Sequence, residues 1–246
     1  MSIVQLDAPE ALVTDAEVSP TASLAIARLT PLTDADWPGR LTATIDFQGC
    51  AWKCTHCQTP ELRDPSVPGA LSWDDVLDAL DERRGMVDAV VLSGGEPTRQ
   101  PALPAAIADL KARGLEVGLL TCGAYPSRLA AVLPDVDWVA LEIKGMPERH
   151  RSVSRGIDGG AKAWLSLELI LDAGVPHEVR FTVDPTVHSR EDVHEVAREV
   201  IRRGASAPVL VQARTRGTSQ EFRSALRGRG IYDVIAIDDL PDLERR

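Results

Sequence analysis

The sequence lacks any long hydrophobic run. No apolar segment reaches the roughly 18 residues that a membrane-spanning helix needs, so we expect no membrane span. The amino-terminal segment MSIVQLDAPEALVTDAEV has neither a basic start nor a long apolar stretch. Because a secretory signal requires both, the sequence predicts none here.

Positive charge is also scarce. The formal net charge is −10, and only four residues are lysines: Lys53, Lys111, Lys144 and Lys162. A general nucleic-acid surface needs a basic patch, so the overall charge argues against a nucleic-acid partner. It does not exclude a small nucleotide-like ligand.

Cysteine is the third scarce residue, and its distribution is uneven. The chain has four cysteines, and three of them lie within the eight residues CAWKCTHC. Closely spaced cysteines without a fourth nearby fit a reducing cytoplasm better than a disulfide framework. We therefore expect a cytoplasmic protein.

The chain does contain a regular alternation of strand and helix patterns. Its 246 residues, 44% of them apolar, suffice for one large domain or two small ones. Strands are predicted at 41–47, 88–95, 115–121, 136–145, 177–183 and 207–213, with a further one at 231–238, and helices at 72–85, 101–114, 125–134, 161–174, 189–204 and 219–230. The alternation predicts an α/β fold with a parallel sheet, either an incomplete (β/α) barrel or an open sheet. Ligands should gather at the carboxyl ends of its strands.

The three clustered cysteines, Cys50, Cys54 and Cys57, follow the first of these strands. Thiolates are soft ligands that select zinc or iron–sulfur clusters. Structural zinc takes four ligands, and here the fourth would have to be Cys122, one strand away, or His56. A 4Fe-4S cluster held by three cysteines keeps one iron open for a substrate or cofactor. A zinc loop or incidental thiols remain the alternatives.

The segment VVLSGGEPTRQP is the second signal. A buried strand ends in Gly94 and Gly95, followed by Glu96 and Pro97. Two glycines remove side chains, so backbone polar groups can approach a ligand directly. The alternative is a tight strand-to-helix turn that needs positive φ.

The spacing C-x-x-x-C-x-x-C after a first strand resembles the radical S-adenosylmethionine superfamily. The longer stretch LTDADWPGRLTATIDFQGCAWKCTHCQTPEL resembles the activating enzymes of glycyl-radical enzymes. Within that group it is similar to the activating protein of anaerobic ribonucleoside-triphosphate reductase and to its pyruvate formate-lyase counterpart. The resemblance covers about residues 29–213. It implies a (β/α)6-type partial TIM barrel, with residues 23–246 as a single radical SAM domain behind an acidic tail or cap at 1–22.

The resemblance also implies the site. The three cysteines would ligate the cluster and serve catalysis, and Gly94 to Pro97 would hold the methionine amino group of S-adenosylmethionine. Glu142 and Lys144 in LEIKGM would bind the ribose and carboxylate, although a structural ion pair is an equal alternative. Further cofactor-binding positions are His56, which stands where the family has an aromatic residue, and Gln58, Thr121 and Arg180. Cys122 is expected to be a bystander thiol, the remaining histidines to lie at the surface or edges, and the tryptophans to serve packing.

The implied activity is reductive cleavage of S-adenosylmethionine at the cluster, followed by formation of a glycyl radical on a partner enzyme. The partner would be anaerobic ribonucleotide reductase, and an external donor such as flavodoxin or ferredoxin would supply the electron. One rival is a radical enzyme acting on a small molecule, as 7-carboxy-7-deazaguanine synthase does. A second rival is a non-enzymatic zinc or iron–sulfur redox module.

Overall fold

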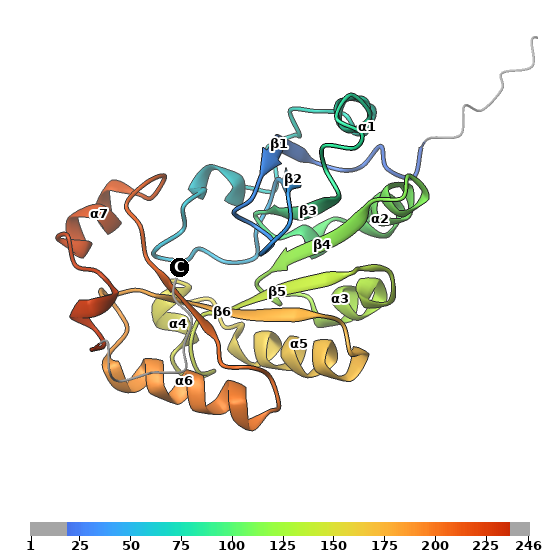
Figure 1. Ribbon diagram of the computed structural model, residues 1–246. Helices are drawn as coiled ribbons and strands as arrows, with labels where there is room; N and C mark the ends of the chain where they lie inside the picture. The colour runs from blue at the N-terminus through green and yellow to red at the C-terminus, as the bar shows by residue number, and fades with distance from the viewer. Residues whose placement is uncertain (1–18, 237–246) are drawn as a thin grey trace, which may run out of the picture.

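The computed structural model describes residues 19–236, which build one seven-stranded sheet in the order β1-β2-β3-β4-β5-β6-β7 (Figure 1). The strands are β1 Ile26–Thr33, β2 Thr42–Phe47, β3 Ala89–Gly94, β4 Glu116–Thr121, β5 Trp138–Ile143, β6 His177–Val183 and β7 Val209–Gln212. Strand β1 runs antiparallel to β2, and every later neighbour pair is parallel. Six parallel strands with crossover helices form an incomplete (β/α) barrel, as predicted.

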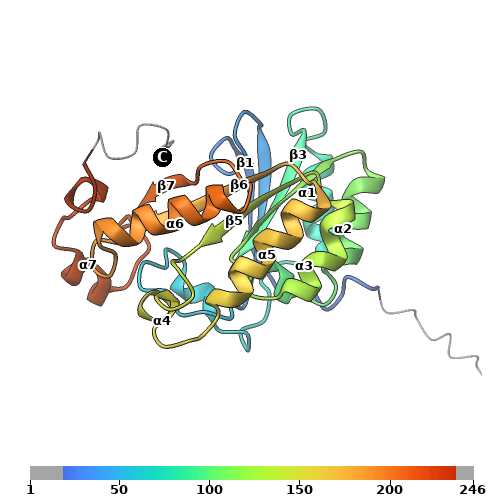
Figure 2. The same ribbon diagram turned by 90° about the horizontal axis from the view of Figure 1, so that it is seen from below.

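Helices connect the parallel strands. They are α1 Trp73–Asp81, α2 Leu103–Ala112, α3 Pro126–Val132, α4 His150–Val153, α5 Gly160–Ala173, α6 Arg190–Arg202 and α7 Gln220–Leu226, with short 3-10 turns at η1 Pro60–Arg63, η2 Pro97–Arg99, η3 Leu133–Asp135 and η4 Ile231–Asp233. Figure 2 shows α2, α3, α5 and α6 side by side over one face of the curved sheet. The other face is therefore left to enclose the barrel interior.

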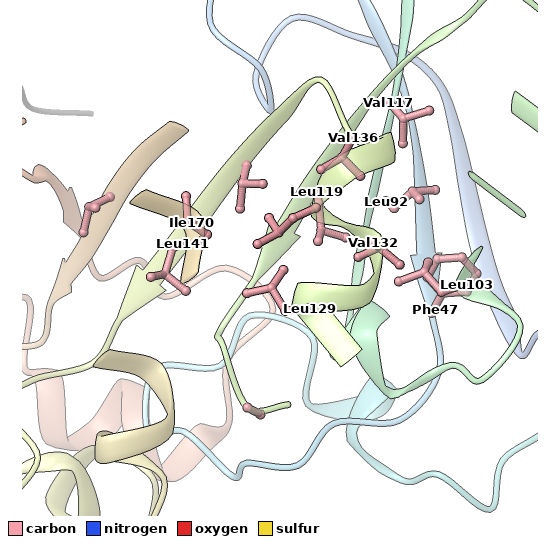
Figure 3. Close-up of a cluster of buried hydrophobic side chains, with 14 of the residues drawn as sticks. Phe47, Leu92, Leu103, Val117, Leu119, Leu129, Val132, Val136, Leu141 and Ile170 are labelled. Carbon is pink, nitrogen blue, oxygen red and sulfur yellow. The ribbon is translucent and has the colours of Figure 1, made fainter. Parts of the chain in front are cut away.

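The main core lies between the sheet and these helices (Figure 3). Alternate strand residues such as Phe47, Leu92 and Leu119 face the helices and are fully buried. Leu103 of α2 and Leu129 of α3 pack onto them in the same cluster. The period of two along each strand sends the intervening residues to the opposite face, where the polar positions lie.

An aromatic pair fills the barrel interior at the amino-terminal ends of the strands. Trp37, in the loop between β1 and β2, stacks on Trp138 with ring centroids 5.1 Å apart. A Cβ on Gly118 would lie 2.7 Å from the Trp37 ring, so only glycine leaves room for this stack. All five tryptophans are buried, which confirms the prediction that they serve packing.

Helix α6 begins with a complete capping box. The Ser189 hydroxyl accepts a hydrogen bond from the Asp192 backbone N–H, and the Asp192 carboxylate accepts from the Ser189 N–H at 2.8 Å. Ser189→Ala is expected to lower the free energy of unfolding by about 1 kcal/mol, because one backbone donor loses its acceptor. Thermal unfolding should show a midpoint about 2–4 °C lower. An unchanged midpoint would mean that the cap is dispensable.

Two sequence expectations need correction. Strand β1 was not predicted, and it makes the sheet mixed rather than wholly parallel. The strand expected at 231–238 is wrong in its described part, since Ile231–Asp233 forms the 3-10 turn η4 and residues 237–238 lie outside the described range. Of the tail predicted at 1–22, residues 19–22 form a turn with Thr21 buried, and 1–18 lie outside the described range.

Among the described helices, none has the length and apolarity to cross a membrane.

Candidate active site

A cavity of about 400 Å³ opens at the carboxyl ends of the parallel strands. Its lining includes eleven of the predicted site residues: Cys50, Cys54, His56, Cys57, Gln58, Gly94, Gly95, Thr121, Glu142, Lys144 and Arg180. Glu96 and Pro97 are buried behind this lining and do not border the cavity. The volume falls in the range of small-molecule sites. Segments far apart in the sequence therefore meet around one ligand-sized space.

The cysteine loop is anchored by backbone and amide hydrogen bonds. The Gln48 side chain donates to the carbonyls of Glu61 and Asp64 at 3.0 and 2.8 Å. The Gly49 N–H donates to the Leu62 carbonyl at 2.7 Å. These bonds close the loop on itself directly after β2, and all three cysteines of the loop border the cavity.

The pKa values of the three thiols are shifted in different directions. Burial raises the pKa of Cys54 to about 12 and also raises the pKa of Cys57. Contact with the Cys122 thiol lowers the pKa of Cys50. Cys54 and Cys57 are therefore thiols at neutral pH in the metal-free chain, and binding of a metal centre must displace their protons.

The end of β3 packs against the end of β2 without space for side chains. Gly94 has φ +111°, and a Cβ there would lie 2.2 Å from the Phe47 nitrogen. A Cβ on Gly95 would lie 2.4 Å from the Gly49 carbonyl oxygen. The two interpretations of the glycine pair, a tight turn and a backbone open to a ligand, are therefore compatible. The turn needs positive φ at Gly94, and the backbone of both glycines borders the cavity.

Glu96 joins the ends of β3 and β4. Its Oε1 accepts from the Thr98 N–H and hydroxyl and from the Thr121 hydroxyl, at 3.0, 2.5 and 2.8 Å. Its Oε2 accepts from the Cys122 N–H and thiol, at 2.8 and 2.9 Å. With its carboxylate fully buried and engaged, Glu96 holds the ends of β3 and β4 together.

Glu96→Gln is expected to lower the free energy of unfolding by about 1–3 kcal/mol. The new amide can accept on one side only, so the backbone N–H of either Thr98 or Cys122 is left buried without an acceptor. Urea unfolding measures the change. Cys122→Ala, which removes one thiol donor and no acceptor, is the matched control and should cost less. Equal losses in the two variants would contradict this account.

Glu142 and Lys144 form an ion pair at the cavity wall. The Lys144 Nζ lies 2.5 Å from Glu142 Oε1, which also accepts from the Thr182 hydroxyl at 2.6 Å. Burial alone would raise the pKa of Glu142, but the charge of Lys144 and the contact with His56 together outweigh it and hold that pKa well below its usual range. Burial would likewise lower the pKa of Lys144, and the Glu142 charge raises it instead. Both groups are charged at neutral pH and present both signs to the cavity.

His56 is buried between the ends of β5 and β6. Its Nε2 lies 3.5 Å from the Lys144 Nζ, and its Nδ1 lies 3.4 Å from Asp184 Oδ2 without a hydrogen bond. His188 accepts from the Asp184 N–H at 3.0 Å and contacts the Lys144 carbonyl at 3.2 Å. Burial lowers the pKa of His188 to about 4. The expectation of surface histidines is thus wrong for His188, and also for the fully buried His150.

Arg180 is paired, as a cation in an apolar strand must be. It donates to Glu178 Oε1 at 2.6 Å and to the Asp36 carbonyl at 2.7 Å. The cavity also includes residues that sequence reasoning missed, namely Asp36, Asp46, Trp52, Ser93 and Thr182. Ser93 and Thr182 could have been found from the period of two along β3 and β6, whereas Asp36 reaches the interior only through the fold of the Trp37 loop.

The fold and the site define the class of protein. The sequence model of the Radical SAM superfamily matches residues 44–200, and the chain belongs to this superfamily. It is therefore a radical SAM enzyme, whose cofactors are a 4Fe-4S cluster and S-adenosylmethionine.

The chain is also similar in sequence to individual proteins with named activities. The chain is 26% identical to a Methanocaldococcus jannaschii protein provisionally named a glycyl-radical enzyme activating enzyme, over 71% of this chain and 75% of that protein. It is 27% identical to the pyruvate formate-lyase-activating enzyme of Clostridium pasteurianum, over 66% and 70%. It is 29% identical to the 7-carboxy-7-deazaguanine synthase of Methanopyrus kandleri, over 43% and 50%.

Solved structures agree on the fold. Streptococcus suis SuiB bound to S-adenosylmethionine aligns with a TM-score of 0.54 at 15% identity, over 67% of this chain and 38% of SuiB. QueE from Escherichia coli aligns with a TM-score of 0.50 at 18% identity, over 78% and 81%. At these identities the likeness establishes the fold alone.

The donor set fits the cluster that this superfamily uses. The three thiols border one cavity, yet within residues 19–236 no three His, Cys, Asp or Glu side chains are arranged to hold a single metal ion. A cluster presents a separate iron to each thiolate, so its ligands need not converge on one point. Three loop thiols on one cavity match the donor set of a 4Fe-4S cluster that keeps one iron open.

Proposed function

We propose that this chain is the activating enzyme of a glycyl-radical enzyme, and that its partner is anaerobic ribonucleotide reductase. The observation that carries the proposal is the single cavity bordered by the three thiols, the Gly94–Gly95 backbone and the Glu142–Lys144 pair. The names of two relatives support the activating class. The D-W-P-G and Q-G-C resemblance supports the reductase as partner.

Each part of the cavity has a role in this proposal. Cys50, Cys54 and Cys57 hold the cluster, and the Gly94–Gly95 backbone accepts from the ammonium of S-adenosylmethionine. Lys144 binds its carboxylate, and Glu142 accepts from its ribose hydroxyls. When bound and reduced by one electron, the cluster supplies the electron that cleaves the sulfonium and yields a radical able to abstract hydrogen.

The protein must also keep that radical from side reactions. The protein walls of the cavity would limit the access of water, and the stacked Trp37 and Trp138 fill the barrel interior where the strands begin. Arg180, which donates to the Asp36 carbonyl, would lie near the cofactor, and Asp36 would face the segment that carries the target glycine. The open sheet, with β1 and β7 unpaired to each other, would admit that segment.

The test is direct labelling of the partner. The anoxically reconstituted chain, a reductant and S-adenosylmethionine are mixed with the anaerobic reductase, and electron paramagnetic resonance should detect a glycyl radical. Cleavage of the nucleotide without any radical on the reductase would refute the proposed partner.

The second candidate is a small-molecule enzyme of the 7-carboxy-7-deazaguanine synthase type. The 29% identity to the M. kandleri synthase favours it, although this match covers only 43% of the chain. Formation of 7-carboxy-7-deazaguanine by the reconstituted chain would establish it. The non-enzymatic redox module is set aside, because the chain belongs to an enzyme superfamily.

A further inference from the structure

Basic residues gather around the cysteine loop, against the charge of the whole chain. The net charge is −10, yet the segments 51–63, 149–158 and 214–229 carry few acids. Together their basic residues are Lys53, Arg63, Arg149, Arg151, Arg155, Arg214, Arg216, Arg223, Arg227 and Arg229, and their acidic residues are Glu61, Asp158 and Glu221. We call the surface of these three segments the basic face.

The three segments meet at the cysteine loop. The Thr55 N–H donates to the Val153 carbonyl at 2.9 Å, and Gly217 packs so closely on Gln58 that a Cβ would lie 2.0 Å from its carbonyl oxygen. A small hollow is lined by residues of all three: Cys54, Thr55, Cys57, Pro60, Arg63, Arg155 and Ser219. Figure 1 shows α4 and α7 flanking this loop. The basic face is thus the outer surface that directly covers two of the three cysteines.

Ion pairs neutralise only part of this charge. Arg149 pairs with Asp192 at 3.0 Å, Arg151 with Asp158 at 3.1 Å and Arg155 with Glu221 at 2.9 Å. The other basic residues make no ion pair within residues 19–236, and all of them except the half-buried Arg63 are exposed. The face therefore keeps a positive surplus on an acidic protein.

A one-electron donor must come close to the cluster, and on the outer side of the cysteine loop the small hollow reaches Cys54 and Cys57. We propose that the basic face is the docking surface for an acidic one-electron carrier protein. Opposite charges raise the encounter rate and orient the donor, while the acidic remainder of the chain repels it elsewhere. The carrier is oxidised by one electron and the cluster is reduced by one, with no bond made or broken. The inference rests on the cysteine loop holding the cluster and not on the identity of the substrate.

The test compares two double charge reversals in the full chain. Lys53→Glu with Arg216→Glu reverses one exposed charge within the cysteine loop and one next to Gly217, which packs on that loop. Arg84→Glu with Arg202→Glu is the matched control, because both side chains are also exposed, at 70% and 68%, and belong to segments outside the basic face. Each control reversal replaces a surface ion pair with a like-charge contact, to Asp81 or to Glu199, and exposed charge pairs contribute little to stability.

Binding of an oxidised acidic flavodoxin is measured by calorimetry at low and high salt, and cluster reduction is followed by absorbance. The test variant should bind at least about tenfold more weakly and be reduced correspondingly more slowly, while the control matches wild type. Added salt should weaken wild-type binding more than variant binding. Reduction by photoexcited deazariboflavin, which is small and uncharged, should be equal in all three.

Unchanged flavodoxin binding in the test variant would overturn the inference. So would equal weakening in the control, or weakened binding of the glycyl-radical partner in place of flavodoxin. None of these readouts requires glycyl-radical formation, so failure of the proposed partner and failure of the docking surface are distinguishable.

Discussion

Replacing Cys54 with alanine is expected to abolish cleavage of S-adenosylmethionine, with a loss of at least about three orders of magnitude, because the cluster that carries the chemistry loses one of three protein ligands. Cys54 is the middle residue of the loop and borders both the main cavity and the small outer hollow. No neighbouring thiol can take its place, since Cys122 lies across the cavity beside Cys50 and donates to Glu96. Iron content and the spectrum of the reduced cluster should fall with the activity.

Cys122→Ala is the matched control for this experiment. It also removes one cavity thiol, but it should retain the wild-type iron content and cleave the nucleotide. Loss of the cluster in Cys122→Ala would show a four-thiolate centre, and cleavage surviving in Cys54→Ala would contradict the three-thiolate site.

Gly94→Ala is expected to be the most destabilising single-methyl change in the site. The new Cβ would lie 2.2 Å from the Phe47 nitrogen and 2.5 Å from its carbonyl oxygen, at φ +111°. Backbone strain of about 1–3 kcal/mol and overpacking of about 1–3 kcal/mol both apply, because β2 and β3 are paired and cannot separate locally. The loss should be about 2–6 kcal/mol, which lowers the thermal midpoint on the order of 10 °C.

Gly114→Ala is the control that distinguishes the free-energy cost of positive φ from the cost of steric overlap. Gly114 also has positive φ, at +77°, but a Cβ there would meet nothing within 4 Å. The control therefore carries only the conformational cost, on the order of 1 kcal/mol. Equal midpoints for the two variants would mean that β2 and β3 can part, and that Gly94 is not needed for close approach. Nucleotide binding should be lost in Gly94→Ala alone.

Local patterns predicted most of the elements because each is encoded within its own segment. Ser189 and the acids after it start α6, and the β-branched run at 41–47 forms β2. Strand β1 escaped prediction because IARLTPLT combines a proline with partly exposed positions, and only its pairing with β2 makes it a strand. The prediction for 231–238 was wrong for the opposite reason. Its residue pattern is typical of a strand, but Ile231–Asp233 forms the 3-10 turn η4.

The candidate site, like the fold, has parts that the sequence alone predicts. The spacing of Cys50, Cys54 and Cys57 determines by itself that one short loop can hold one metal centre. The glycine pair at 94–95 likewise determines a bare backbone at a strand end. Neither requires knowledge of the rest of the chain, because the ligands are neighbours in sequence.

Tertiary structure alone decided what these segments face. The Glu96 carboxylate, for example, accepts hydrogen bonds from the Thr121 hydroxyl and the Cys122 backbone N–H, both at the end of the next strand. Asp36 and the basic face around Arg216 have no local signature, because long-range folding brings them to the cavity and to the cysteine loop. Sequence specifies which groups can bind and react, and the packing of distant segments decides which of them remain free to do so.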